Sequence, residues 1–225
     1  MEQAEITTSL VVTWPEDVPA LAQEAARSPG RLYSLLWFDS RRPDRSLQEL
    51  TLLVERFPSV LVGVKTVFPY LYQNPLQQEF FPVYEFCQKR HLPIQFHFGG
   101  NPRMEEVCRP SLFVALARTF PELPIVCLHA GGGWHREMPN LLATCPNVYL
   151  EVEGLQLHEA QLHLPPQMLP YLLQRSGSAK IMFGSDRIGR EEKFFRRVQF
   201  ISSIPPPYRD DLCQRTATRV YRLQG

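Results

Sequence analysis

The sequence lacks any imbalance of charge. Its 24 lysine and arginine residues nearly equal its 23 aspartate and glutamate residues, which gives a formal net charge of +1 at pH 7. A protein that is drawn to nucleic acid or to an anionic membrane by its overall field carries a large positive excess. We therefore expect no nucleic-acid partner, and we expect a small-molecule substrate that is neutral or locally acidic.

Long apolar runs are also missing. The longest, such as Val60–Val64 and Ile125–Leu128, fall far short of the roughly 18 residues that indicate a membrane span. The first residues, MEQAEITTSL, lack the basic and apolar segments of a signal peptide. These absences predict a cytoplasmic protein without a membrane partner.

Paired cysteines are absent. The five cysteines include no C-x-x-C pair and their number is odd, which argues against a disulfide framework or a zinc ribbon. We expect them to act as small core hydrophobes in a reducing compartment. They are Cys87, Cys108, Cys127, Cys145 and Cys213.

The sequence does contain a repeat of short β-rich runs, each followed by residues of helical period. This alternation is typical of a parallel sheet built from β-α units, and the lack of Asn-Gly hairpin signals favours a closed barrel. We predict one TIM-type (β/α) barrel domain over residues 1–225, distorted or incomplete because only seven strands are recognisable. The runs are Ile6–Val12, Leu32–Phe38, Val60–Val67, Ile94–Phe98, Ile125–His129, Val148–Glu153 and Ile181–Asp186.

Helix start signals precede several of the helical stretches. Ser46 and Glu49 have the spacing of a capping box, in which each side chain bonds the other residue's backbone N–H. An apolar stripe follows them at helical spacing. We therefore expect a helix that begins at Ser46.

Polar side chains end several of the runs, which matters because a (β/α) barrel has its active site at the carboxyl ends of its strands. Strand alternation puts Gln95 and His97 on one face of the fourth run, and Cys127 and His129 on one face of the fifth. Asp186 ends the seventh. Two imidazoles and a carboxylate at one barrel mouth are suited to bind a divalent metal, or to pair a general acid or base with an electrophile. Glycines follow both histidines, namely Gly99, Gly100, Gly131, Gly132 and Gly133.

Each of these residues also has a structural interpretation. A histidine on a strand is commonly a hydrogen-bonded core residue, although two histidines followed by glycines at successive strand ends weigh against that. The structural alternative for Asp186 is a helix N-cap or an ion pair with Arg187 or Arg190. Lys65, near the end of the third run, needs an anion if it is buried, and Glu151, Asp186 or a substrate carboxylate would supply one.

Five stretches follow one another in the order and at the spacing of a known family. They resemble the amidohydrolase-related barrels, which include aminocarboxymuconate-semialdehyde decarboxylase, aromatic-acid decarboxylases, lactonases and other metal-dependent hydrolases. The stretches are GVKTV from Gly63, LPIQFHFGG from Leu92, FPELPIVCLHAGGG from Phe120, CPNVYLEVEG from Cys145 and AKIMFGSD from Ala179.

The resemblance implies a divalent metal, zinc or alternatively manganese, with His97, His129 and Asp186 as ligands. His129 matches a histidine that ligates metal or polarises the substrate, and Asp186 matches the aspartate that moves the proton of the attacking water. The implied activity is hydrolysis of an amide, ester or lactone, with Asp186 and His129 as catalytic residues. The family offers non-oxidative decarboxylation as the alternative.

The chain departs from the family pattern at its start. Family members open with a strand that carries His-x-His, whereas no histidine here precedes His91, so half of the usual metal cage is missing. If Asp186 also serves as the base, two histidines alone would bind zinc poorly. A barrel that kept a binding role and lost catalysis is therefore a further alternative.

We expect four residues to contact the substrate. They are Lys65, Glu151, Trp134 and Arg187, and with neighbouring aromatic and basic side chains they suggest a small planar or acidic compound.

The absent strand also predicts an open edge. The first and last runs would lie side by side without it, and the inner faces of Leu10, Val12, Ile181 and Phe183 would lose a neighbour. An open apolar edge is costly in a stable monomer. We expect the two strands either to pair directly or to be covered by another chain, such as a second copy in a homodimer.

Overall fold

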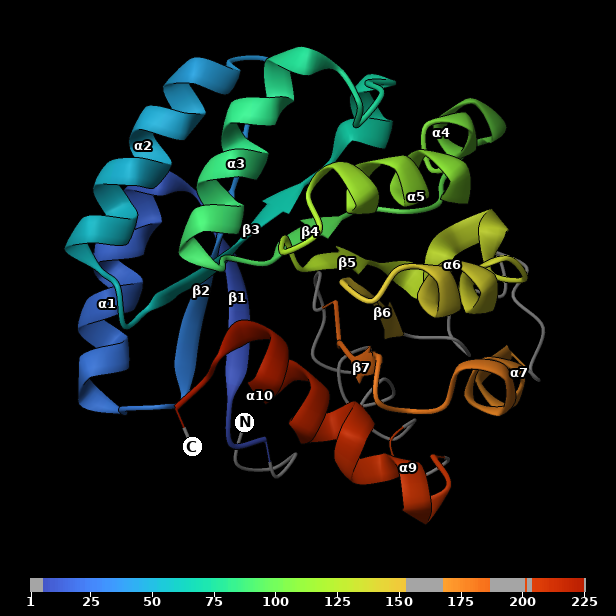
Figure 1. Cartoon of the computed structure of the whole chain (residues 1–225). Helices are drawn as coiled ribbons and strands as arrows, with labels where there is room; N and C mark the ends of the chain where they lie inside the picture. The colour runs from blue at the N-terminus through green and yellow to red at the C-terminus, as the bar shows by residue number, and fades with distance from the viewer. Residues whose placement is uncertain (1–5, 153–167, 187–200, 202–203, 225) are drawn as a thin grey trace.

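The computed structural model describes residues 6–152, 168–186, 201 and 204–224. All seven predicted strands are present, and they pair in parallel in sequence order from β1 to β7 as an open half-barrel (Figure 1). The strands are β1 (Ser9–Thr13), β2 (Leu32–Trp37), β3 (Leu61–Thr66), β4 (Ile94–Phe96), β5 (Ile125–Cys127), β6 (Val148–Val152) and β7 (Ile181–Phe183).

Helices cover the outer face of the sheet, and the main core lies between the two layers. Alternate strand residues such as Ile94, Phe96, Ile125 and Cys127 point into this core and are almost completely buried. The helices are α1 (Val18–Arg27), α2 (Pro43–Arg56), α3 (Phe81–Arg90), α4 (Pro102–Glu106), α5 (Pro110–Thr119), α6 (Met138–Thr144) and α7 (Met168–Ser176).

Helix α2 begins earlier than its sequence signal predicts. Pro43 occupies the first turn, where its fixed φ and missing N–H fit a helix start, so the expected capping box is wrong. Ser46 lies on the buried face with Leu50 and Val54, and its hydroxyl donates to the backbone oxygen of Asp39 at 3.1 Å.

The C-terminal segment fills the inner face of the half-barrel. The helical turns α9 (Pro206–Asp210), η6 (Asp211–Arg215) and α10 (Thr216–Tyr221) lie in the opening between β1 and β7 (Figure 1). Val220 and Tyr221 pack in a second apolar cluster with inward-facing strand residues, namely Leu35, Val126, Leu128 and Met182. Direct pairing of the first and last strands, one of the two expected outcomes, is therefore wrong. The inner face is filled by the same chain.

The predicted facing of β7 is also wrong. Ile181 pairs in register with Leu150, whose side chain lies in the core beneath the helices, so Ile181 points there too. Met182 is the inward residue. On β1, Leu10 packs against the inner cluster as expected, whereas Val12 is 44% exposed at the sheet edge.

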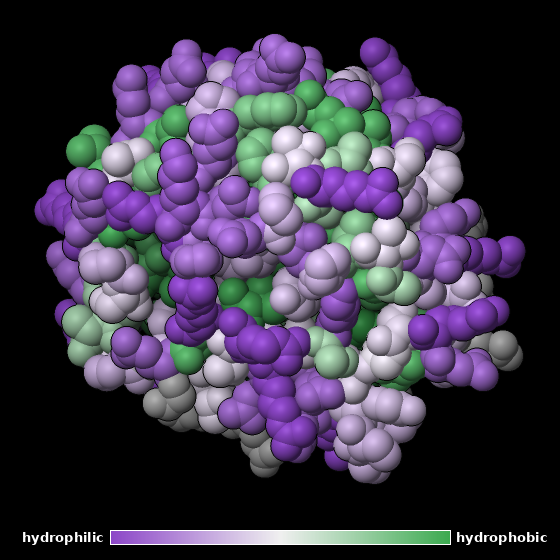
Figure 2. Space-filling model, in the orientation of Figure 1, coloured by the Kyte–Doolittle hydropathy of each residue, from purple (hydrophilic) through white to green (hydrophobic). Residues whose placement is uncertain are grey.

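The surface is largely hydrophilic, as expected for a sequence without long apolar runs. Hydrophilic side chains cover most of the face seen in Figure 2, and hydrophobic ones show in the gaps between them. No helix in the described ranges is both long and apolar enough to cross a membrane. Four of the five cysteines are buried as predicted, and Cys213 is exposed.

Candidate active site at the carboxyl ends of the strands

Two histidines from neighbouring strands meet at the carboxyl edge of the sheet. His97 follows the last residue of β4, and His129 opens a short helical turn, η5 (His129–Trp134), just after β5. Nδ1 of His97 and Nε2 of His129 are 2.9 Å apart, and the ring centroids are separated by 4.4 Å. One ring nitrogen therefore donates a hydrogen bond to the other.

His129 reaches this position through its backbone conformation. Strand alternation predicted that it would share a face with Cys127, but Cys127 points into the core beneath the helices. Leu128 is still extended, and His129 then adopts a left-handed φ of 56°, which turns the chain out of the strand. The backbone N–H of His129 donates to Oε2 of Glu151 at 3.3 Å. A single left-handed residue is thus what turns this imidazole toward His97.

The glycines after the two histidines let their loops touch. Gly132 has a φ of +56°, and a Cβ placed on it would come within 2.5 Å of the backbone nitrogen of Gly99. Any other residue would therefore push the two loops apart. Within the two glycine runs that stood out in the sequence, Gly132 and Gly99 have this packing role.

Burial sets the protonation state of His97. Desolvation, together with the nearby charges of His129 and Lys65, lowers the pKa of His97 to about 2. His97 is therefore neutral at physiological pH. A neutral imidazole can accept a proton or ligate a metal ion.

Lys65 points to the inner face of the sheet. Val64 before it lies in the core beneath the helices, and the Cα of Gly63 faces the ring of Tyr221, which belongs to the inner cluster. Lys65 is only 8% exposed. Its inward orientation is confirmed, while an acidic partner in Glu151 or Asp186 stays a prediction. Glu151 is 7% exposed and its carboxylate lies against Gly184, so it too faces the interior.

Asp186 follows β7 and has a left-handed φ of 39°. The described residues contain no group of three or more histidine, cysteine, aspartate or glutamate side chains arranged to hold a metal ion. The structure thus brings two of the three predicted ligands into contact, and the set of three stays a proposal. Arg187 lies outside the described residues.

The histidine pair fits a metal ion by the chemistry of its donor atoms, because neutral imidazoles are common ligands of zinc. Nδ1 of His97 and Nε2 of His129 are hydrogen-bonded to each other at 2.9 Å. An ion held by both nitrogens would replace that hydrogen bond and would need further ligands from elsewhere.

Trp134 has a structural role that the sequence did not reveal. Its indole Nε1 donates to the backbone oxygen of Glu105 at 2.8 Å, and the guanidinium of Arg109 lies 5.6 Å from the ring centroid. These contacts join η5 to α4. A contact of Trp134 with substrate stays a prediction.

Sequence reasoning missed Tyr70, in the short turn η3 (Phe68–Leu71) after β3. Its ring centroid lies 4.7 Å from that of His97, and the residue is 57% exposed. The adjacent Tyr72 carries the guanidinium of Arg103 at 4.1 Å from its ring centroid. The sequence signal was the pair of tyrosines that follows a strand end.

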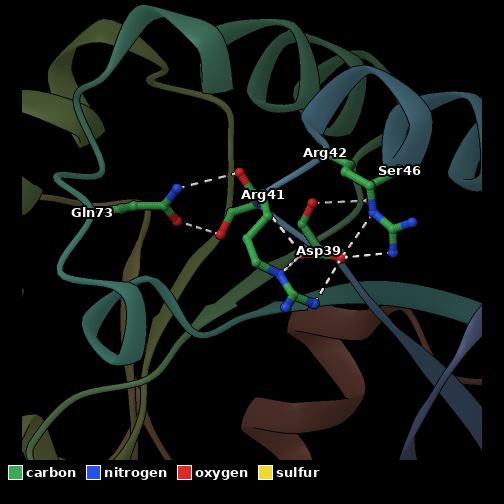
Figure 3. Close-up of polar contacts among 6 residues, drawn as sticks. Asp39, Arg41, Arg42, Ser46 and Gln73 are labelled. Atoms are coloured by element: carbon green, nitrogen blue, oxygen red, sulfur yellow. Dashed lines mark hydrogen bonds and ion pairs between the residues drawn. The ribbon is translucent and has the colours of Figure 1, made fainter.

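The loops after β2 and β3 are joined beside this turn. Asp39 accepts hydrogen bonds from Arg41 at 2.8 Å and from Arg42 at 3.0 Å (Figure 3). The Arg41 bond holds the pKa of the Asp39 carboxyl at about 2. The side chain of Gln73 accepts from the Ser40 hydroxyl and donates to the Ser40 backbone oxygen at 3.3 Å. These contacts fix the loops at the mouth of the half-barrel.

Comparison with known proteins agrees with this architecture. The model of the amidohydrolase family matches residues 15–223. No curated protein matches the chain.

Three solved structures are similar to the chain at low sequence identity. An uncharacterised TIM-barrel protein of Bordetella bronchiseptica has a TM-score of 0.76 and 18% identity, and the alignment covers 98% of this chain and 79% of that one. A candidate 2-pyrone-4,6-dicarboxylic acid hydrolase of Pseudomonas putida has a TM-score of 0.65 and 18% identity, with 96% and 82% covered. A dihydroxybenzoic acid decarboxylase of a Polaromonas species, with bound manganese and an inhibitor, has a TM-score of 0.68 and 14% identity, with 97% and 79% covered. At these identities the likeness establishes the fold.

Proposed function

This chain belongs to the amidohydrolase family, and we propose that it is a metal-dependent hydrolase that cleaves an amide, ester or lactone bond in a small acidic compound. The observation that carries this proposal is the contact between His97 and His129, whose ring nitrogens are 2.9 Å apart at the carboxyl edge of the sheet. Because His97 is neutral at physiological pH, its imidazole can ligate a cation without a net loss of charge.

In this proposal His97 and His129 hold a zinc or manganese ion, and Asp186 completes the protein ligands. When bound, such an ion lowers the pKa of a water molecule and polarises the scissile carbonyl. Asp186 accepts the proton of the attacking water and delivers it to the leaving group. Glu151 holds the backbone N–H of His129 and so keeps that imidazole in place.

Five side chains are proposed to bind the substrate. The ammonium of Lys65, buried beside His97, pairs with a substrate carboxylate. Tyr70 provides an exposed ring next to His97 for a planar group. The remaining predicted contacts are Glu151, Trp134 and Arg187. The acidic compounds named for two of the structural neighbours make carboxylated lactones and benzoates sensible first probes.

The first test is metal analysis of the purified chain after incubation with zinc or manganese. We expect about one ion per chain, as three protein ligands would provide, and its loss in the His97→Ala and His129→Ala variants. His91→Ala is the matched control, because His91 is an exposed residue at the end of α3. A wild-type chain that takes up no ion would refute the proposal.

The second test is turnover of a carboxylated lactone. Hydrolysis releases acid and incorporates one oxygen atom from labelled water into the product. We expect this activity to need the metal and to be lost in Asp186→Asn. Metal-loaded chain that turns over no amide, ester or lactone in a broad panel would contradict the assignment.

Decarboxylation is the second candidate, and the buried ammonium of Lys65 beside His97 favours it. A cation in that position binds a substrate carboxylate close to the reacting atoms. Release of carbon dioxide from a hydroxybenzoate, without oxygen uptake from water, would establish this reaction. Lys65→Met is expected to raise KM strongly for either acidic substrate.

A further inference from the structure

We propose that Glu105 is a positioning residue that holds the loop carrying His129 against His97. The geometric part of this inference stands on the structure, and its consequence for metal binding rests on the proposed function. Glu105 lies near the end of α4, which follows β4, whereas His129 opens the loop after β5.

Glu105 bonds this loop at two places. Its carboxylate Oε1 accepts from the backbone N–H of Gly133 at 3.0 Å, and its backbone oxygen accepts from the Trp134 indole at 2.8 Å. The α4 helix that presents Glu105 is itself capped. Asn101 accepts from the backbone N–H groups of Arg103 and Met104, each at 3.0 Å. One residue thus fastens two successive positions of η5 to the loop after β4.

The fastened loop has an unfavourable conformation. His129, Ala130, Gly131 and Gly132 all have left-handed φ values, of 56°, 53°, 83° and 56°. His129 and Ala130 have side chains, which disfavour the left-handed conformation. A loop of this shape needs contacts at its far end to persist. Glu105 makes those contacts four and five residues after His129.

The surroundings of the carboxylate leave it little freedom. A Cβ on Gly133 would lie 3.1 Å from Cδ of Glu105, so the glycine permits the close approach. The second oxygen, Oε2, is buried and has no hydrogen-bond partner among the described residues. Burial raises the pKa of this carboxyl, and the Gly133 N–H opposes that shift. The bond to Gly133 is therefore the contact that holds the carboxylate against the loop.

The test compares two substitutions that separate reach from charge. Glu105→Asp keeps the charge but is one methylene too short to reach Gly133. Glu105→Gln keeps both the length and the accepting oxygen but removes the charge. Glu106→Asp and Glu106→Gln are matched controls, because Glu106 is the next residue of α4 and forms an exposed ion pair with Arg109.

The first readout is the NMR spectrum of ¹⁵N-labelled histidine rings, assigned with His97→Ala and His129→Ala. We expect Glu105→Asp to shift the ring signals of both His97 and His129. The spectral feature that reports the hydrogen bond between the two rings should disappear. Glu105→Gln and both Glu106 variants should retain the wild-type signals. Urea unfolding of every variant checks that the fold is intact.

The second readout is affinity for manganese or zinc alone. Loss of a residue that orients a ligand typically weakens metal binding about 10- to 100-fold, and we expect that loss for Glu105→Asp and less than about 2-fold for Glu105→Gln. Wild-type ring signals in Glu105→Asp would overturn the inference, as would a Glu105→Gln variant that is equally impaired. A wild-type chain that binds no metal would overturn the proposed function, while the ring signals would still decide the role of Glu105.

Discussion

The most informative stability test is removal of one hydroxyl from the helix that fills the half-barrel. Tyr221 is 4% exposed, and its hydroxyl accepts from Nε2 of Gln95 at 2.8 Å. Gln95 lies on β4, two residues before His97. Tyr221→Phe keeps the ring and its packing, so the substitution isolates the hydrogen bond.

The expected loss of stability follows from the amide N–H that Gln95 still carries in the variant. Without the hydroxyl, a partly buried amide N–H loses this partner, which costs at most about 1 to 3 kcal/mol. For a chain of this size each kcal/mol lowers Tm by about 2 to 4 °C, so we expect a decrease of about 2 to 12 °C. Tyr221→Ala also leaves a cavity and should cost about 3 to 5 kcal/mol.

Urea unfolding followed by circular dichroism measures the effect. The matched control is Tyr171→Phe, because the Tyr171 hydroxyl donates to the backbone oxygen of Arg136 at 3.0 Å near the surface. Water replaces that bond, and we expect a change within about 0.5 kcal/mol. If Tyr221→Phe cost no more than Tyr171→Phe, the placement of α10 inside the half-barrel would be refuted.

Two further predictions concern the loops at the mouth. Gly132→Ala should destabilise the fold by at least about 1 kcal/mol more than Gly177→Ala. Both glycines have positive φ, but only a Cβ at Gly132 would meet backbone atoms, those of Gly99. Equal unfolding free energies of the two variants would contradict that contact. Asp39→Asn should cost about 1 kcal/mol at neutral pH, since the arginine partners are exposed. Arg41 lowers the pKa of Asp39 to about 2. The greater stability of the wild-type chain over Asp39→Asn is therefore present above about pH 4 and disappears as the pH falls toward 2. Urea unfolding at several pH values measures this difference.

Sequence patterns predicted the strands well because each strand is a compact apolar run. All seven appear in the expected order, and their bounds differ by a few residues, as for β1, which begins at Ser9 instead of Ile6. The facing of β7 was wrong because a three-residue strand gives alternation too few positions to fix its phase. Its neighbour β6, through the pairing of Leu150 with Ile181, decides which side chain points inward.

The candidate site was harder to predict at the level of single contacts. The approach of His97 to His129 depends on a left-handed φ at His129, a residue type that carries no sequence signal for that conformation. Glu105 and Tyr70 come from loops far along the chain from the residues that they contact. Their roles follow from loop packing, which has no periodic pattern.

The open edge of the sheet illustrates a different kind of error. The gap between β1 and β7 was expected to close by direct pairing of these two strands or to be covered by another chain, because unpaired backbone and an open apolar edge are both costly. The apolar part of the gap, however, needs only apolar side chains, and Val220 and Tyr221 supply them from a helix. Backbone pairing and core burial are separate requirements, and this chain meets the second from within.

That solution couples the C-terminal helix to the candidate site. Tyr221 bonds Gln95, which shares the inner face of the fourth strand with His97. Burial raises the pKa of Tyr221, and the charge of Glu151 adds to that shift, so this carboxylate is also close to α10. Glu151 in turn accepts the backbone N–H of His129. Gln95 on β4 and Glu151 on β6, which lie beside the histidine pair, therefore both lie close to one helix, α10. In a closed barrel, strand side chains alone would provide that support. We accordingly compare two substitutions that leave the chain folded and cost the same stability. One in α10 is expected to disturb the contact between His97 and His129 more than one on the outer face of α2.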